Sequence, residues 1–97
     1  MVEIKWTREA VNWLNDIHDY IAIDDPKAAK RVVEEIFGKV QVLRRLPEVG
    51  YRYNRYPGLN IRILLYGHYR IVYLIKSEDR IDILGVFHGA LEIERYL

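Results

Sequence analysis

Arg70 and His88 are the residues of this 97-residue chain whose types best suit chemistry on a phosphate group. A guanidinium binds phosphate and stabilises negative charge that develops in a transition state, and an imidazole exchanges a proton near neutral pH. The two residues face each other if the hairpin after Lys76 is centred on Asp79, and such a pair could serve phosphodiester cleavage. A fixed hydrogen-bonding pair or a partner contact is the alternative, and a one-residue slip would send the two side chains to opposite faces.

A basic segment rich in tyrosine provides the second candidate site. Residues 51–76 contain five basic residues and no carboxylate. Arg52, Arg55 and Arg62 could neutralise the phosphates of RNA or contact another target, while Tyr51, Tyr53 and Tyr56 could stack on unpaired bases. The same alternation of Tyr and Arg is also typical of an edge strand with one buried face.

The length of the turn between the expected strands 59–66 and 69–76 decides whether Arg62 lies on the same face of the sheet as Arg70. If Gly67-His68 alone forms the turn, Arg62 lies on the face of Tyr73. If the turn contains three residues, Arg62 lies on the face of Arg70 instead. The sequence leaves both arrangements open.

Motifs for cofactors and metals are missing. The chain has no cysteine, no glycine-rich phosphate loop and no nucleophile elbow, and its three histidines are too far apart in sequence to suggest a preformed metal cluster. We therefore expect neither a metal ion nor another cofactor. Glu48, on a loop ahead of the expected sheet, is interpreted as a solvated carboxylate rather than a base.

The first half of the chain predicts a strand and two helices. Residues 2–6 alternate apolar and polar side chains, as a short strand does, and Thr7 can cap a helix that runs to about Ile23. Asp25 and Pro26 suit the start of a second helix, which should end near Leu46 because a proline follows. Four aromatic residues are expected to pack in the core or between the helices. They are Trp6, Trp13, Tyr20 and Phe37.

From residue 51 the apolar period changes to two, which predicts strands over 51–56, 59–66, 69–76 and 80–87. Their short connections favour antiparallel hairpins. The predicted fold is α+β, in one domain over residues 1–97: an N-terminal strand, an antiparallel helical hairpin on one face of a twisted antiparallel sheet of four to five strands, and a short C-terminal helical turn over 90–97. Residues 69–76 are apolar on both faces, so we expect the second face to stay partly open for a partner.

Composition supports a single globular domain in a reducing compartment. Apolar residues make up 51% of the chain and charged residues 30%, which excludes disordered and fibrous classes. The net charge of +1 means that any nucleic-acid role must come from local clustering. No window is long and apolar enough for a membrane span, and the absence of cysteine favours the cytoplasm.

In their order and spacing, five segments of the chain resemble the RelE/ParE superfamily of bacterial toxins. The segments are Trp6 with the helix into Asp19-Tyr20-Ile21-Ala22, then Pro47-Glu48-x-Gly50, Pro57-Gly58-Leu59, Tyr69-Arg70-Ile71-Val72-Tyr73, and Ile81-x-Ile83-Leu84-x-Val86-x-His88-Gly89. The resemblance implies the toxin of a type II toxin-antitoxin or plasmid-stabilisation module. It also implies a cognate antitoxin that wraps the sheet and helices. The expected assembly is a toxin-antitoxin hetero-oligomer or a homodimer of the toxin.

Two activities occur in that superfamily. ParE-like members inhibit DNA gyrase and are not enzymes, and RelE-like members are metal-independent endoribonucleases that cut mRNA on the ribosome. In the RNase branch the resemblance makes Arg70 and His88 catalytic, with Tyr96 as a substitute for a tyrosine that members often carry where this chain has Gly89.

The small basic load favours the ParE-like branch, because binding to ribosomal RNA would exploit many positive charges. In that branch no residue is catalytic, and the sheet edge with the C-terminal turn is the recognition surface. A third reading is an inactive toxin fold that serves only as a binding scaffold.

Overall fold

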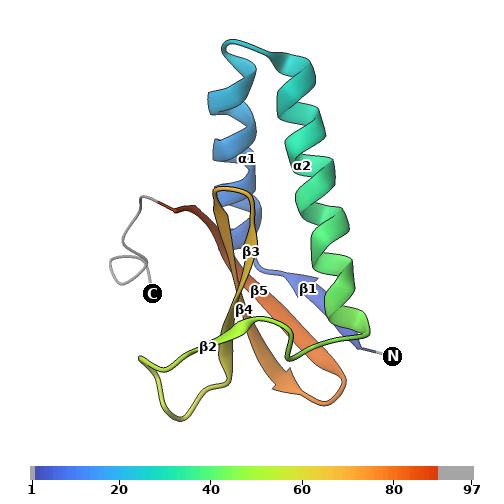
Figure 1. Ribbon diagram of the computed structural model, residues 1–97, viewed down its shortest axis with the longest axis vertical. Coiled ribbons are helices and arrows are strands. Elements are labelled where there is room, and N and C mark those ends of the chain that lie inside the picture. Colours follow the sequence, from blue (N-terminus) through green and yellow to red (C-terminus); the bar gives the residue numbers. More distant parts are fainter. Residues whose placement is uncertain (1, 90–97) are drawn as a thin grey trace.

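The computed structural model describes residues 2–89, which form a helical hairpin packed on a five-stranded sheet (Figure 1). The α+β architecture predicted from the sequence is confirmed. Tyr96 and the helical turn expected over 90–97 lie outside the described residues. The elements in chain order are β1 (Glu3–Trp6), α1 (Arg8–Ala22), α2 (Pro26–Val40), the 3-10 helix η1 (Gln41–Arg44), β2 (Tyr51–Tyr53), β3 (Ile61–Tyr66), β4 (Tyr69–Ser77) and β5 (Arg80–His88).

The sheet order is β1-β5-β4-β3-β2, and β2 to β5 are antiparallel as expected. β1 differs, because it pairs in parallel with β5. The chain reaches β5 only after the helical hairpin and three other strands, so no tight turn forces the first and last strands to run in opposite directions. The sheet is therefore mixed.

Both helices begin at the predicted caps. The Thr7 hydroxyl accepts a hydrogen bond from the Ala10 amide at 3.1 Å, and a carboxylate oxygen of Asp25 accepts one from the Ala28 amide at 3.1 Å. Each cap satisfies a backbone donor that the first turn of a helix leaves unpaired. α2 ends earlier than predicted, at Val40, and the chain tightens into η1 before Pro47.

The main core lies between the helices and one face of the sheet. Its members are apolar residues that are buried almost completely: Ala10, Leu14, Ile36, Val40, Leu43, Leu64, Ile71, Tyr73, Ile81, Ile83 and Val86. Tyr20 is not part of it, because its side chain is 78% exposed. The prediction that Tyr20 is a core residue is therefore wrong. Its helical spacing is right, but the end of α1 projects beyond the sheet (Figure 1).

The second face of the sheet buries a smaller apolar cluster of its own. Ile61, Ile63, Val72 and Phe87 are almost inaccessible. β1 pairs with β5 only as far as Ile83. Beyond that point, the ring of Trp13 from α1 meets the ring of Phe87 edge-on, with ring centroids 4.8 Å apart. Leu65, on the same face of β3, is 56% exposed. The expectation that this face stays partly open for a partner therefore remains a prediction.

Candidate functional site

The pairing of β4 with β5 differs from the predicted register. The turn contains only two residues, since Ser77 pairs with Arg80. Two irregularities follow: the first skips Lys76 in β4 and the second skips Leu84 in β5, so their effects on the register cancel. The register beyond them therefore depends on turn length alone, and it is one residue away from the predicted one.

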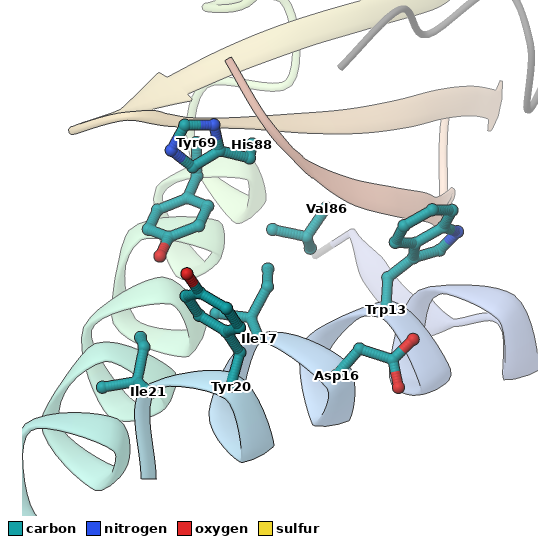
Figure 2. Close-up of a pocket in the computed structure, with 8 residues that line it drawn as sticks. All are labelled: Trp13, Asp16, Ile17, Tyr20, Ile21, Tyr69, Val86 and His88. Carbon is teal, nitrogen blue, oxygen red and sulfur yellow. The ribbon is translucent and has the colours of Figure 1, made fainter. Parts of the chain in front are cut away.

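Arg70 and His88 consequently lie on opposite faces of the sheet. Arg70 pairs with Phe87, and His88 pairs with Tyr69. The ring of His88 meets the ring of Tyr69 edge-on, with centroids 5.8 Å apart, on the side of α1 (Figure 2). The prediction that the two residues face each other is wrong, and the one-residue slip that the sequence left open is what occurs.

The two residues nevertheless approach the same hollow at the end of the sheet. This hollow has a volume of about 340 Å³ and is lined by Leu65, Gly67, His68, Tyr69, Arg70, His88 and Gly89. The rings of His68 and His88 lie 6.2 Å apart and nearly parallel, at 24°. The Gly89 amide donates to the His68 carbonyl at 2.6 Å, which ties the end of β5 to the turn between β3 and β4. We call this site the histidine hollow.

Arg62 occupies a different place, on the face of Tyr73, as a two-residue Gly67-His68 turn predicts. Its guanidinium donates to the carbonyls of Glu48 at 3.1 Å and Gly50 at 2.9 Å, and to the Asn60 side-chain oxygen at 3.1 Å. Only 15% of its side chain is exposed. These contacts assign Arg62 to holding the loop ahead of β2.

Tyr73 holds the same loop from below. Its hydroxyl donates to the Pro47 carbonyl at 2.7 Å and accepts from the Gly50 amide at 3.0 Å. Burial raises the pKa of Tyr73 above its ordinary value, so the phenol keeps its proton to a higher pH than an exposed tyrosine does. We call Arg62, Tyr73 and the loop from Pro47 to Gly50 the loop clasp.

The remaining predicted binding residues lie around β2, at the sheet edge. Arg52 and Arg55 are exposed, and Arg52 is the strand partner of Arg62. Tyr51 is exposed, whereas the rings of Tyr53 and Tyr56 pack against the apolar cluster of the second face. The structure therefore keeps two arginines and one tyrosine of this segment available at the edge.

A second hollow, of about 450 Å³, lies between α1 and the adjacent ends of β4 and β5 (Figure 2). Trp13, Asp16, Ile17, Tyr20 and Ile21 line it from α1, and Tyr69, Val86 and His88 line it from the sheet. The rings of Tyr20 and Tyr69 point toward each other across it (Figure 2). We call it the apolar hollow. Ile23, 79% exposed, follows it at the tip of the helical hairpin.

Sequence reasoning missed two of these features. The sequence pattern predicts only a turn position for His68. The signal that could have placed it near the site is its spacing of two residues from Arg70, which is the repeat of a strand face. The apolar hollow was missed because Trp13 and Tyr20 fit the apolar stripe of α1, and a stripe does not show where its helix outruns the sheet.

Tyr66 connects the sheet to α2. Its hydroxyl donates to a Glu35 carboxylate oxygen at 2.5 Å, and this hydrogen bond raises the pKa of Tyr66.

Within residues 2–89 no group of three or more His, Asp or Glu side chains is arranged to hold a metal ion. None of the described helices is long and apolar enough to cross a membrane.

Comparisons with known proteins agree with this fold. The chain is 38% identical over 86 residues to the protein named "Putative toxin Y4kP" of Sinorhizobium fredii (strain NBRC 101917 / NGR234), covering 89% of this chain and 86% of that protein. A structure of the chromosomal ParDE toxin-antitoxin system from P. aeruginosa matches with a TM-score of 0.72 and 27% identity, over 91% of this chain and 96% of the other.

A structure of the RelBE2 toxin-antitoxin complex from Mycobacterium tuberculosis matches with a TM-score of 0.59 and 29% identity, over 90% of this chain and 96% of the other. The family model described as the ParE toxin of the type II toxin-antitoxin system parDE matches residues 4–92. Since that match spans nearly the whole sequence, the chain belongs to the ParE toxin family of type II toxin-antitoxin systems.

Proposed function

We propose that this toxin inhibits growth by blocking DNA gyrase in the cytoplasm and that a cognate antitoxin neutralises it. The separation of Arg70 from His88 carries the choice of target. An RNase that relied on this pair would need the guanidinium and the imidazole on one phosphate, and the register places the two residues on opposite faces. The ParE family model and the match to the ParDE structure support the same choice.

In this proposal the edge around β2 contacts the target. Arg52 and Arg55 are exposed there and are not committed to holding the loop, in contrast to Arg62. Positive side chains at the rim of an interface steer association with an acidic surface. Tyr51 adds an exposed aromatic ring beside them.

A supercoiling assay with purified gyrase tests the target. We expect the wild-type chain to abolish supercoiling, and we expect the double variant Arg52→Glu, Arg55→Glu to weaken inhibition by at least about tenfold, because two favourable charges become repulsive. Lys27→Glu is the matched control, since Lys27 is an exposed cation on α2. Unaffected supercoiling at high molar excess of the wild-type chain would contradict the proposal.

A parallel assay with purified ribosomes tests the alternative, a RelE-like mRNA endonuclease. The match to the RelBE2 structure and the presence of both Arg70 and His88 in the histidine hollow favour this second candidate. Codon-dependent cuts in mRNA that vanish in Arg70→Ala would establish it. Harmless expression without an antitoxin, with no effect in either assay, would instead point to an inactive scaffold.

The antitoxin is proposed to cover the apolar hollow and the hairpin tip. Tyr20 and Ile23 are the most exposed large apolar residues of the described chain, and exposed apolar patches of this kind mark interaction sites. Tyr20→Ser with Ile23→Ser should leave toxicity intact and reduce rescue by the co-expressed antitoxin. Leu59→Ser, an exposed apolar residue in the connection between β2 and β3, is the control. Full rescue of the double variant would reject this surface.

A further inference from the structure

Two large apolar side chains are exposed together at the loop clasp. Leu46 is 55% exposed and Val49 is 49% exposed. They line one hollow of about 390 Å³, with Arg45, Pro47 and Glu48 as its other lining residues. The Val49 amide donates to the Leu46 carbonyl at 3.2 Å, which closes the turn between them. Single exposed apolar residues are ordinary on a protein surface, but two that share a hollow form a patch.

The loop clasp holds this patch in one position. The Tyr73 hydroxyl bonds the backbone at Pro47 and Gly50. The Arg62 guanidinium donates to the carbonyls of Glu48 and Gly50. Burying a guanidinium costs free energy, and a surface connection that only joins η1 to β2 could leave its backbone to water instead. A loop that is ordered before a partner docks loses little conformational entropy on binding.

The charges around the patch favour an acidic partner. Arg45 is exposed and lines the same hollow. The carboxylate of Glu48 also lines it, but lies 3.6 Å from the Arg62 guanidinium, which balances its charge. The strand partner of Arg62 is the exposed Arg52, so the patch continues into the edge around β2. Cations around an apolar centre complement a protein surface that carries an apolar side chain among carboxylates.

We propose that the hollow of Leu46 and Val49 receives an apolar side chain of the toxin's protein target, and that Arg45 pairs with a carboxylate beside it. The inference rests on the proposed function, because it gives the target-contacting edge around β2 an apolar centre. Charges at the rim, such as Arg52 and Arg55, speed association, whereas a docked apolar side chain slows dissociation. A nucleic-acid target would use the arginines alone, since aliphatic side chains offer neither charge nor a flat ring for stacking.

The double variant Leu46→Ser, Val49→Ser tests the apolar centre. It should weaken the inhibition of gyrase supercoiling by about tenfold, as expected when the centre of an interface loses its apolar contacts. Val11→Ser is the matched control, because Val11 is an apolar residue of α1 that is 39% exposed, and it should inhibit as the wild type does. Urea unfolding verifies that both variants are folded. Undiminished inhibition by the folded double variant would overturn the proposal.

A milder variant keeps the test decisive if the double variant is unstable. Val49→Thr preserves the shape of the side chain and adds one hydroxyl to the hollow. It should weaken inhibition by about threefold, because the hydroxyl must lose water when the target docks. Inhibition equal to that of the wild type would then overturn the proposal.

Rates of binding to immobilised gyrase separate the two kinds of contact. The serine double variant should dissociate about tenfold faster and keep the salt dependence of the wild type. Arg45→Gln should weaken binding by about threefold and make it less dependent on salt. If Arg45→Gln weakens binding and the double variant does not, the surface makes the charge contacts typical of nucleic acids, and the apolar docking site is wrong.

Growth arrest separates a failure of this inference from a failure of the proposed function. If the wild-type chain does not inhibit gyrase, gyrase is the wrong target, and the variants are then expressed in cells without an antitoxin. Growth arrest that is lost in the folded serine double variant and kept in Val11→Ser would still support the patch as the contact with the target. Growth arrest by both variants would overturn it. A wild-type chain that neither inhibits gyrase nor arrests growth would overturn both proposals.

Discussion

Arg62 and Arg70 lie on neighbouring strands but do different work. Arg62 is nearly buried in the loop clasp, where three oxygen acceptors surround its guanidinium. Arg70 is half-buried at the other end of β4 and lines an open hollow with two histidines. Arg70 also donates to a backbone carbonyl, that of Gly89, but at 3.5 Å. The comparison teaches that the number and closeness of the backbone carbonyls around a strand arginine decide how firmly it holds a neighbouring loop.

The largest expected effect is at Gly50, inside the loop clasp. A Cβ atom at this position would lie 2.8 Å from the Ile63 carbonyl oxygen and 2.8 Å from the Tyr73 hydroxyl. Gly50→Ala should lower the free energy of unfolding by about 3 kcal/mol, since neither neighbour can yield easily. Urea unfolding measures it. Gly58→Ala is the control, because no atom lies within 4 Å of its Cβ position; equal losses in the two variants would contradict a tight clasp.

Removing the Arg62 guanidinium should come next. Arg62→Met leaves the carbonyls of Glu48 and Gly50 without this donor and should cost about 2 kcal/mol of unfolding free energy. Arg52→Met is a matched control, because Arg52 pairs with Arg62 across the strands and is exposed. It should change stability by less than about 0.5 kcal/mol. Equal losses of stability in the two variants would show that the hydrogen bonds of Arg62 do not stabilise the loop clasp.

The hydroxyl of Tyr73 should contribute about 1.5 kcal/mol, because Tyr73→Phe breaks two hydrogen bonds of the loop clasp. It also changes the alkaline behaviour. Burial raises the folded-state pKa of Tyr73 above 10.0, so the stabilisation linked to its proton is complete below pH 10 and is lost as the pH rises through the folded pKa. Urea midpoints across this range should fall more steeply for wild type than for Tyr73→Phe. Parallel curves would show that Tyr73 does not titrate differently in the two states.

The smallest loss of stability is expected at Gly67, in the turn between β3 and β4. Gly67→Ala places a Cβ in a left-handed conformation and should cost about 1 kcal/mol, although no atom crowds the site. Its unfolding free energy should therefore exceed that of Gly50→Ala by about 2 kcal/mol. A greater loss of unfolding free energy in Gly67→Ala than in Gly50→Ala would contradict the tight packing around Gly50.

Much of the fold could be predicted from the sequence, because its signals are local. Thr7, Asp25 and Pro26 mark helix starts by the chemistry of their own side chains, and the change of period near residue 51 marks the sheet. The parallel pairing of β1 with β5 had no local signal, since it joins residues at opposite ends of the chain.

The site was harder to predict for the same reason. The faces of Arg70 and His88 depend on whether the β4–β5 turn has two or three residues, and Ser77, Glu78 and Asp79 suit either length. The role of Arg62 depends on carbonyls of a loop more than ten residues away in sequence. Residue type and spacing identified the arginines, but only tertiary contacts separate their roles.

The position of β5 has a consequence for how the toxin is made. This strand comes last in sequence among the described elements yet lies inside the sheet, between β1 and β4. A chain that stops before Arg80 leaves β1 without its strand partner and removes Ile81, Ile83 and Val86 from the main core. The sheet and its main core can therefore form only after β5 has been synthesised, and products that terminate before Arg80 should be left to proteolysis.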